Sequence, residues 1–217
     1  MNFKALFIEL NKFANPEIAR QMSAYMKDQF EHLGIQTPQR RASCKPFFKA
    51  AAQEEIDWDF IRQCWDCPYR ELQYAALDYL VLMKAKLVPR DIPKLYDLIT
   101  HKSWWDTIDG LDRIVGAVAL NYPEVKETLL AWSQDDNFWL RRIAIDHQLL
   151  RKEKTDTQLL EKILLNNLGQ TEFFINKAIG WALRDYSKTN PDWVRKFIER
   201  HHAGLAKLSI KEASKYL

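Results

Sequence analysis

Apolar residues recur every three to four positions along almost the whole chain, and no segment alternates apolar and polar residues as a β-strand does. Residues that favour helix starts, several of them next to a proline, precede many of these segments. They predict helices that begin near Asn15, Thr37, Asp57, Tyr69, Asp91, Ser103, Pro123, Asn137, Thr155 or Asp156, Thr171, Asn190 and Ser209. The first of these is expected to end at Gly34. The pattern predicts an all-α fold of short helices joined by short loops.

A small residue recurs every 34 positions, each time in the second helix of a predicted helix pair: Ala42, Ala76, Gly110, Ala144 and Ala178. Apolar residues follow one and five positions later, for example Leu77 and Val81, or Leu111 and Val115. A fixed period of this length with paired helices is typical of an α-solenoid. We therefore expect residues 1–217 to form one α-solenoid domain of paired helical repeats. Chance alignment of common residues in a helical bundle is the alternative.

The repeat allows a prediction of which residues share a face. If each residue advances the helix by about 100°, the positions 5, 2 and 1 before the small residue and 3 after it fall within an arc of about 140°, away from the core. Cations and aromatic residues dominate these positions, and Glu71 and Asp109 are the only acids. The full set is Arg40, Arg41, Lys45, Glu71, Tyr74, Tyr79, Trp105, Asp109, Arg113, Trp139, Arg142, His147, Phe173, Asn176, Lys177 and Trp181. Stacked second helices line a concave surface in solenoids. A concave basic groove suited to a phosphate backbone is the prediction, although the aromatic residues and His147 are also explained by packing.

Asp109 is unusual in this set because a carboxylate repels phosphate. It lies four residues after Trp105, so the carboxylate and the indole share a helical face. Asp106, in contrast, is expected to complete a capping box with Ser103, at the start of a helix that runs to about Leu120. Two explanations remain for Asp109. It forms an ion pair with Arg113 or Arg142, or it stabilises positive charge that develops in a transition state.

Composition adds little that is specific. The chain is 47% hydrophobic and 28% charged, with a net charge of +3. No apolar segment is long enough to span a membrane and no signal sequence is visible, so a cytoplasmic location is expected. The three cysteines, which include the pair Cys64 and Cys67, are expected to be reduced packing residues. We find no phosphate-binding loop, no metal-ligand spacing and no nucleophile with a nearby histidine, and expect no metal or cofactor.

Several motifs resemble the AlkD-like DNA alkylation repair glycosylases, a family built from HEAT-like repeats. Their combined order and spacing extend over essentially the whole chain, except that the end after His202 matches least. The motifs are Leu33-Gly34-Ile35-Gln36-Thr37-Pro38 with Arg40-Arg41, Lys102-Ser103-Trp104-Trp105-Asp106 through Asp109, Trp139-Leu140 with Arg142, and Glu172-Phe173-Phe174 with Lys177-Ala178-Ile179-Gly180-Trp181.

The resemblance implies roles for particular residues. Asp109 corresponds to the catalytic aspartate of the family and Arg142 to its catalytic arginine, and the helical register favours Arg142 over the adjacent Arg141. Trp105 and Trp181 correspond to two tryptophans that face DNA. The segments Gln36-Thr37-Pro38 and Arg40-Arg41 correspond to a region that contacts the DNA backbone; from the register, Lys45, Arg113 and Lys177 are also expected to bind DNA.

The implied activity is hydrolysis of the N-glycosidic bond of cationic alkylated purines, such as 7-methylguanine and 3-methyladenine, in duplex DNA. Asp109 would stabilise an oxocarbenium-like sugar and could position the attacking water, without a cofactor and in a protein expected to be a monomer. Two other hypotheses remain: a HEAT-type protein that binds damaged or structured DNA without cutting it, and a solenoid that binds other proteins.

Overall fold

The computed structural model describes residues 1–217, and its regular elements are all helical. This confirms the all-α prediction. Five short 3₁₀-helices accompany thirteen α-helices. The α-helices are α1 (Phe3–Asn11), α2 (Pro16–Tyr25), α3 (Thr37–Ala51), α4 (Trp58–Asp66), α5 (Arg70–Met83), α6 (Ile92–Thr100), α7 (Trp105–Asn121), α8 (Val125–Trp132), α9 (Phe138–Asp146), α10 (Thr157–Leu165), α11 (Phe173–Ser187), α12 (Pro191–His201) and α13 (Lys207–Ala213). None of them combines the length and the apolar character required to cross a bilayer.

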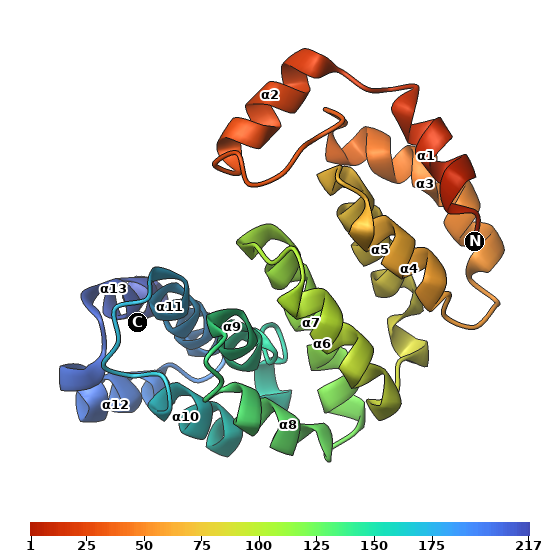
Figure 1. The fold of residues 1–217 in the computed structure, drawn as a ribbon. Coiled ribbons are helices and arrows are strands. Elements are labelled where there is room, and N and C mark those ends of the chain that lie inside the picture. The colour runs from red at the N-terminus through yellow and green to blue at the C-terminus, as the bar shows by residue number, and fades with distance from the viewer. The chain divides into compact units, whose positions relative to one another are not determined.

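The chain divides into two compact units, Met1–Leu87 and Val88–Leu217, which are described separately. The expected single domain over residues 1–217 and its concave basic groove stay predictions. In the first unit, α3 packs between α1 and α5, and α4 packs against α5 (Figure 1).

A buried glutamate organises the segment that leads into α3. The carboxylate of Glu71 accepts hydrogen bonds from the backbone N–H groups of Leu33, Gly34 and Ile35, at 2.8–3.0 Å. Gly34 has φ +86°, and a Cβ there would lie 2.0 Å from the carbonyl oxygen of Asn15. The prediction that Gly34 ends the helix begun at Asn15 is wrong, because α2 ends at Tyr25 and Gly34 allows close backbone contact instead.

In the second unit, the even-numbered and odd-numbered helices form two layers. Helices α7, α9, α11 and α13 stack in order along the chain, and α6, α8, α10 and α12 pack against them (Figure 1). Each pair such as α6 and α7, or α8 and α9, is one helical repeat. The odd-numbered helices are the second helices of the predicted pairs.

Hydrogen bonds between neighbouring repeats reproduce the period seen in the sequence. Leu150 and Asp185 are bonded 35 positions apart, and Asn167 and Ser133 34 positions apart. Ser209 of α13 donates to the carbonyl group of Asn176 of α11, 33 positions earlier. The repeat therefore continues into α13, beyond the last small residue recognised in the sequence.

The predicted core positions are largely correct, but the predicted outward face is partly wrong. Ala76, Ala144 and Ala178 are fully buried. Ala42, the first small residue of the repeat, is exposed, and Val81, predicted to face the core, is 48% exposed. Several residues predicted to face away from the core are buried: Arg40, Glu71, Tyr79, Arg142, His147 and Asn176. A second helix within a layer contacts its own first helix and the second helices on either side, so burial covers more of its circumference than one stripe.

Two predicted caps are also wrong. Ser103 does not cap α7, which begins at Trp105; its hydroxyl donates to the carbonyl group of Ile99 at 2.6 Å. Ser209 lies inside α13, which begins at Lys207, and its hydroxyl serves the contact with α11. Both hydroxyl groups bond to a carbonyl group of a preceding segment, which competes with capping. Cys44, Cys64 and Cys67 are buried free thiols.

Candidate active site

Helices α7 and α9 bring together Asp109 and Arg142. The Nε and Nη2 atoms of Arg142 both lie 2.8 Å from Oδ1 of Asp109. Nη1 of Arg142 donates to the carbonyl group of Phe174, in the first turn of α11, at 2.7 Å. The Arg142 side chain is only 2% exposed, whereas that of Asp109 is 23% exposed. Of the two ion pairs that the sequence left open, the one with Arg142 is formed, and Arg113 is exposed without an ion pair.

Trp181 of α11 completes this group. The Arg142 guanidinium lies 5.0 Å from the centroid of the indole, at cation–π distance. Asp109 and Trp181 line one cavity of about 350 Å³, together with Arg113, Leu150, Asp185 and others. Trp105 lies one helical turn before Asp109, is half-buried and is not part of this lining. Trp139, predicted to be either surface or core, is buried in an aromatic cluster with Trp104 and Phe174.

Two further cations approach Trp181. Lys177 Nζ and the guanidinium carbon of Arg184 each lie 5.9 Å from the indole centroid. Glu212 of α13 holds both, accepting hydrogen bonds from Lys177 at 2.7 Å and Arg184 at 2.6 Å. The bond from Lys177 is the main cause that lowers the pKa of Glu212 to about 2. The helices approach closely here because Gly180 lacks a side chain; a Cβ would meet Glu212 Cβ at 2.6 Å.

Two buried aspartates lie behind the Asp109–Arg142 pair. Oδ2 of Asp146 is 3.8 Å from Nε of Arg142, and neither oxygen of Asp146 has a hydrogen-bond partner. Burial raises the pKa of Asp146 to about 7, although Arg142 opposes the shift. Burial, and then the charge of Asp146, raise the pKa of Asp112 well above its usual range. Burial also raises the pKa of Asp109, and Arg142 is the main group that opposes this.

The sequence analysis missed these acids, although a signal was present. Asp78, Asp112 and Asp146 each lie two positions after a small residue of the repeat, and are therefore 34 residues apart. Asp78 has a comparable contact in the first unit, because it accepts hydrogen bonds from Arg40 at 3.0 Å and Arg41 at 3.1 Å. In each unit, therefore, an acid at this position of the repeat lies close to an arginine of a second helix.

Stability should depend on pH through Asp146. A carboxyl group whose pKa rises on folding stabilises the folded state below its unfolded pKa, and this contribution is lost as the pH rises through the folded value. The contribution of Asp146 to the free energy of unfolding should therefore fall between about pH 4 and pH 7, with a slope of at most about 1.4 kcal/mol per pH unit. Asp146→Asn should flatten this fall in urea titrations at several pH values. The exposed Asp136→Asn should retain it, and an equal slope in both variants would contradict the assignment.

The predicted DNA-binding residues near the N-terminus lie in the first unit, at the start of α3. Gln36, Thr37 and Pro38 are exposed, as is Lys45. The Arg41 side chain is 65% exposed and paired with Asp78. Arg40 is buried, pairs with the same aspartate and lies 4.9 Å from the centroid of the Tyr74 ring. Arg40 therefore supports the position of its neighbours and presents little surface to a ligand.

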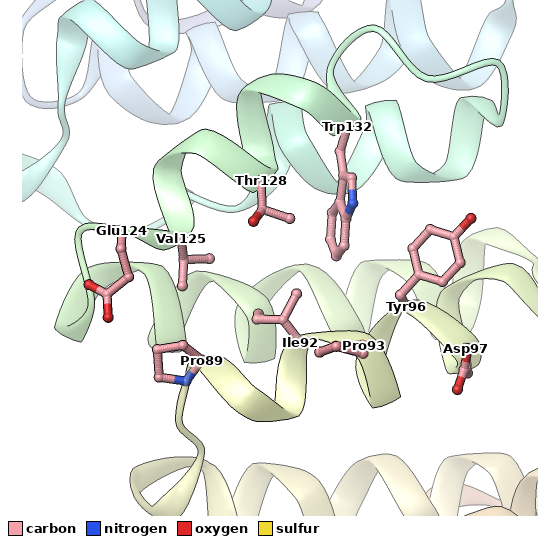
Figure 2. A pocket seen from close by; sticks show the side chains of 9 residues that line it. All are labelled: Pro89, Ile92, Pro93, Tyr96, Asp97, Glu124, Val125, Thr128 and Trp132. Atoms are coloured by element: carbon pink, nitrogen blue, oxygen red, sulfur yellow. The ribbon is translucent and has the colours of Figure 1, made fainter.

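A larger cavity of about 470 Å³ lies between α6 and α8 (Figure 2). Its lining is mainly apolar, with Tyr96 and Trp132 on one side and Val125 among the other residues. Asp97 and Glu124 lie toward opposite ends, and no cation lines it. Such a surface repels phosphate, so the smaller cavity beside Asp109, which Arg113 also lines, is the better candidate for an active site.

The fold and the site define an all-α helical-repeat protein that holds a carboxylate–arginine pair beside a tryptophan. A family profile described as DNA alkylation repair enzyme matches residues 8–217, so the chain belongs to that family. A solved structure titled as a predicted DNA alkylation repair enzyme from Enterococcus faecalis is 36% identical, with a TM-score of 0.87 over 94% of this chain and 96% of that one. A search of curated proteins finds no match. The family predicted from the motifs is thus confirmed.

Proposed function

We propose that this protein is a monofunctional DNA glycosylase that excises cationic alkylated purines, such as 7-methylguanine and 3-methyladenine, from duplex DNA. The observation that carries the proposal is the placement of Asp109. Its carboxylate is partly exposed on the wall of a cavity, in company with Trp181, and Arg142 fixes its orientation. Membership of the DNA alkylation repair enzyme family supports DNA as the substrate.

The chemistry requires little from the protein. An alkylated purine that already carries a positive charge leaves as a neutral base, taking the electron pair of the N-glycosidic bond, so no general acid is needed. The deoxyribose then becomes oxocarbenium-like, and water attacks C1′. At an effective dielectric constant of 20, unit charges 4 Å apart attract by about 4 kcal/mol. A nearby carboxylate therefore supplies about a thousandfold in rate.

Arg142 serves this chemistry through Asp109. Burial disfavours the ionised carboxylate, and the adjacent guanidinium counteracts that effect. The side chain of Arg142 is nearly inaccessible to solvent. This geometry supports a positioning role for Arg142 more than direct contact with phosphate.

The remaining contacts are proposed from exposure and charge. Trp105 and Trp181 would pack against the deoxyribose of the damaged nucleotide. Arg113 and Lys177 would contact phosphates near the lesion, and the exposed residues Gln36, Thr37, Pro38, Arg41 and Lys45 would contact the backbone elsewhere. Phosphate contacts of this kind make binding depend strongly on salt.

Release of free 7-methylguanine from methylated duplex DNA tests the proposal. We expect release in a single-turnover assay, with abasic sites left in an intact strand. Lys188 lines the same cavity as Asp109. The Nζ atom of Lys188 lies 4.9 Å from the centroid of the Tyr216 ring, at cation–π distance. Because this contact holds the ammonium group, we expect no strand cleavage. Tight binding to DNA without release would support the non-catalytic alternative, and absence of both would support a protein-interaction solenoid.

A further inference from the structure

Leu150 combines two properties that are uncommon together. The residue is 63% exposed, and its backbone has φ +67°, in the left-handed region. A residue with a Cβ adopts this region at an energetic cost, and leucine has no polar group that offsets the cost by a local hydrogen bond. Exposure of a single leucine is ordinary by itself. A strained backbone that presents an apolar side chain to solvent calls for an explanation.

The turn that contains Leu150 is fixed from both neighbouring second helices. The Leu150 N–H donates to Oδ2 of Asp185 in α11 at 2.7 Å. Nη2 of the adjacent Arg151 donates to the carbonyl group of Gly116 in α7 at 2.6 Å. A strained backbone conformation persists only where contacts with the surrounding structure hold it in place, and such positions cluster at functional sites.

The strained turn borders the candidate active site. Leu150 and Asp185 line the cavity that also contains Asp109 and Trp181. The same lining contains three cations, Arg113, Arg184 and Lys188, and three acids, Asp109, Asp112 and Asp185. Arg142 pairs with Asp109, and Asp185 accepts the hydrogen bond from the Leu150 N–H. An exposed apolar group close to cations suits the DNA backbone, in which charged phosphates alternate with the C–H faces of the sugars.

We propose that Leu150 is a DNA-binding residue that packs on the deoxyribose of a nucleotide next to the one that loses its base. The contact holds the strand in register with Asp109. This inference rests on the proposed function, because it takes the cavity as the place where the DNA strand binds. It adds an apolar contact to a cavity lined mainly by charged residues and Trp181.

The first test is Leu150→Ala with Leu165→Ala as its control. Leu165 is 43% exposed at the end of α10 and lines none of the cavities described. For Leu150→Ala we expect the KM for methylated duplex DNA, and the Kd for the same DNA, to rise about tenfold with kcat nearly unchanged, because an apolar contact is lost. The slope of log Kd against log salt should stay as in the parent protein, because no cation is removed. Leu165→Ala should match the parent.

Leu150→Gly separates binding from folding. Glycine adopts positive φ freely, so the unfolding midpoint should equal or exceed that of Leu150→Ala, while the KM rises at least as much. Unchanged Kd and KM in both variants would overturn the proposal and leave Leu150 as part of a helix-terminating turn. If the parent releases no base but Leu150→Ala still weakens DNA binding, the proposed glycosylase fails and the Leu150 contact stands. If the parent releases base normally and the Leu150 variants keep the Kd and KM of the parent, the proposed glycosylase stands and the Leu150 contact fails.

Discussion

Replacement of Asp109 by asparagine is expected to lower the rate of 7-methylguanine release by about a hundredfold to a thousandfold, the range found when one charge-stabilising group is removed from an active site. The amide keeps the shape of the carboxylate and can still accept a hydrogen bond from Arg142. It lacks the negative charge that stabilises the oxocarbenium-like sugar. Affinity for methylated duplex DNA should change little, or should increase slightly, because a repulsive charge is removed.

The matched control is Asp106→Asn, on the same helix and within its first turn. It removes one negative charge three residues before Asp109, so both variants share the change in net charge. Single-turnover release with enzyme in excess, and binding under the same salt conditions, separate chemistry from affinity. Release by Asp109→Asn within a few-fold of the parent would remove the carboxylate from the proposed mechanism.

The second large effect is expected at Arg142. Arg142→Ala removes the partner of Asp109 and the donor to the Phe174 carbonyl group, and leaves Asp146 without the nearest positive charge. Loss of one member of a buried ion pair costs about 3–5 kcal/mol. We expect a loss of stability of this size in urea unfolding monitored by circular dichroism. Release of alkylated base should fall along with it, because Asp109 loses its orientation.

Arg141→Ala is the control for this change. Arg141 is adjacent and half-buried, and it forms no ion pair. Its replacement should cost about 1 kcal/mol or less. Arg142→Lys retains the charge, but an ammonium group lacks the fork that contacts Asp109 and Phe174 together, so it should restore only part of the stability. A larger loss in Arg141→Ala than in Arg142→Ala would show that the roles of the two arginines are reversed.

The sequence by itself determined the helical class, the repeat and the residues that converge at the site. Helix periodicity and start signals are local properties, and a 34-residue spacing places equivalent residues of successive repeats side by side. Asp109 and Arg142, 33 positions apart on α7 and α9, are paired for this reason. Trp181 of α11 follows in the next repeat, and the family motifs identified the same three residues.

The tertiary structure decided which of these residues are accessible and what surrounds them. Arg40 and Arg142 were assigned to an outward face and are buried, because neighbouring second helices cover both sides of that face. The left-handed backbone of Leu150 has no signal in the sequence, since no glycine or asparagine marks it. Nor could the contacts of Glu212 with Lys177 and Arg184 be predicted, because they depend on how closely α13 approaches α11. Burial, ion pairing and strain arise from packing between repeats, and a periodic pattern specifies which helices meet but not how deeply their side chains are covered.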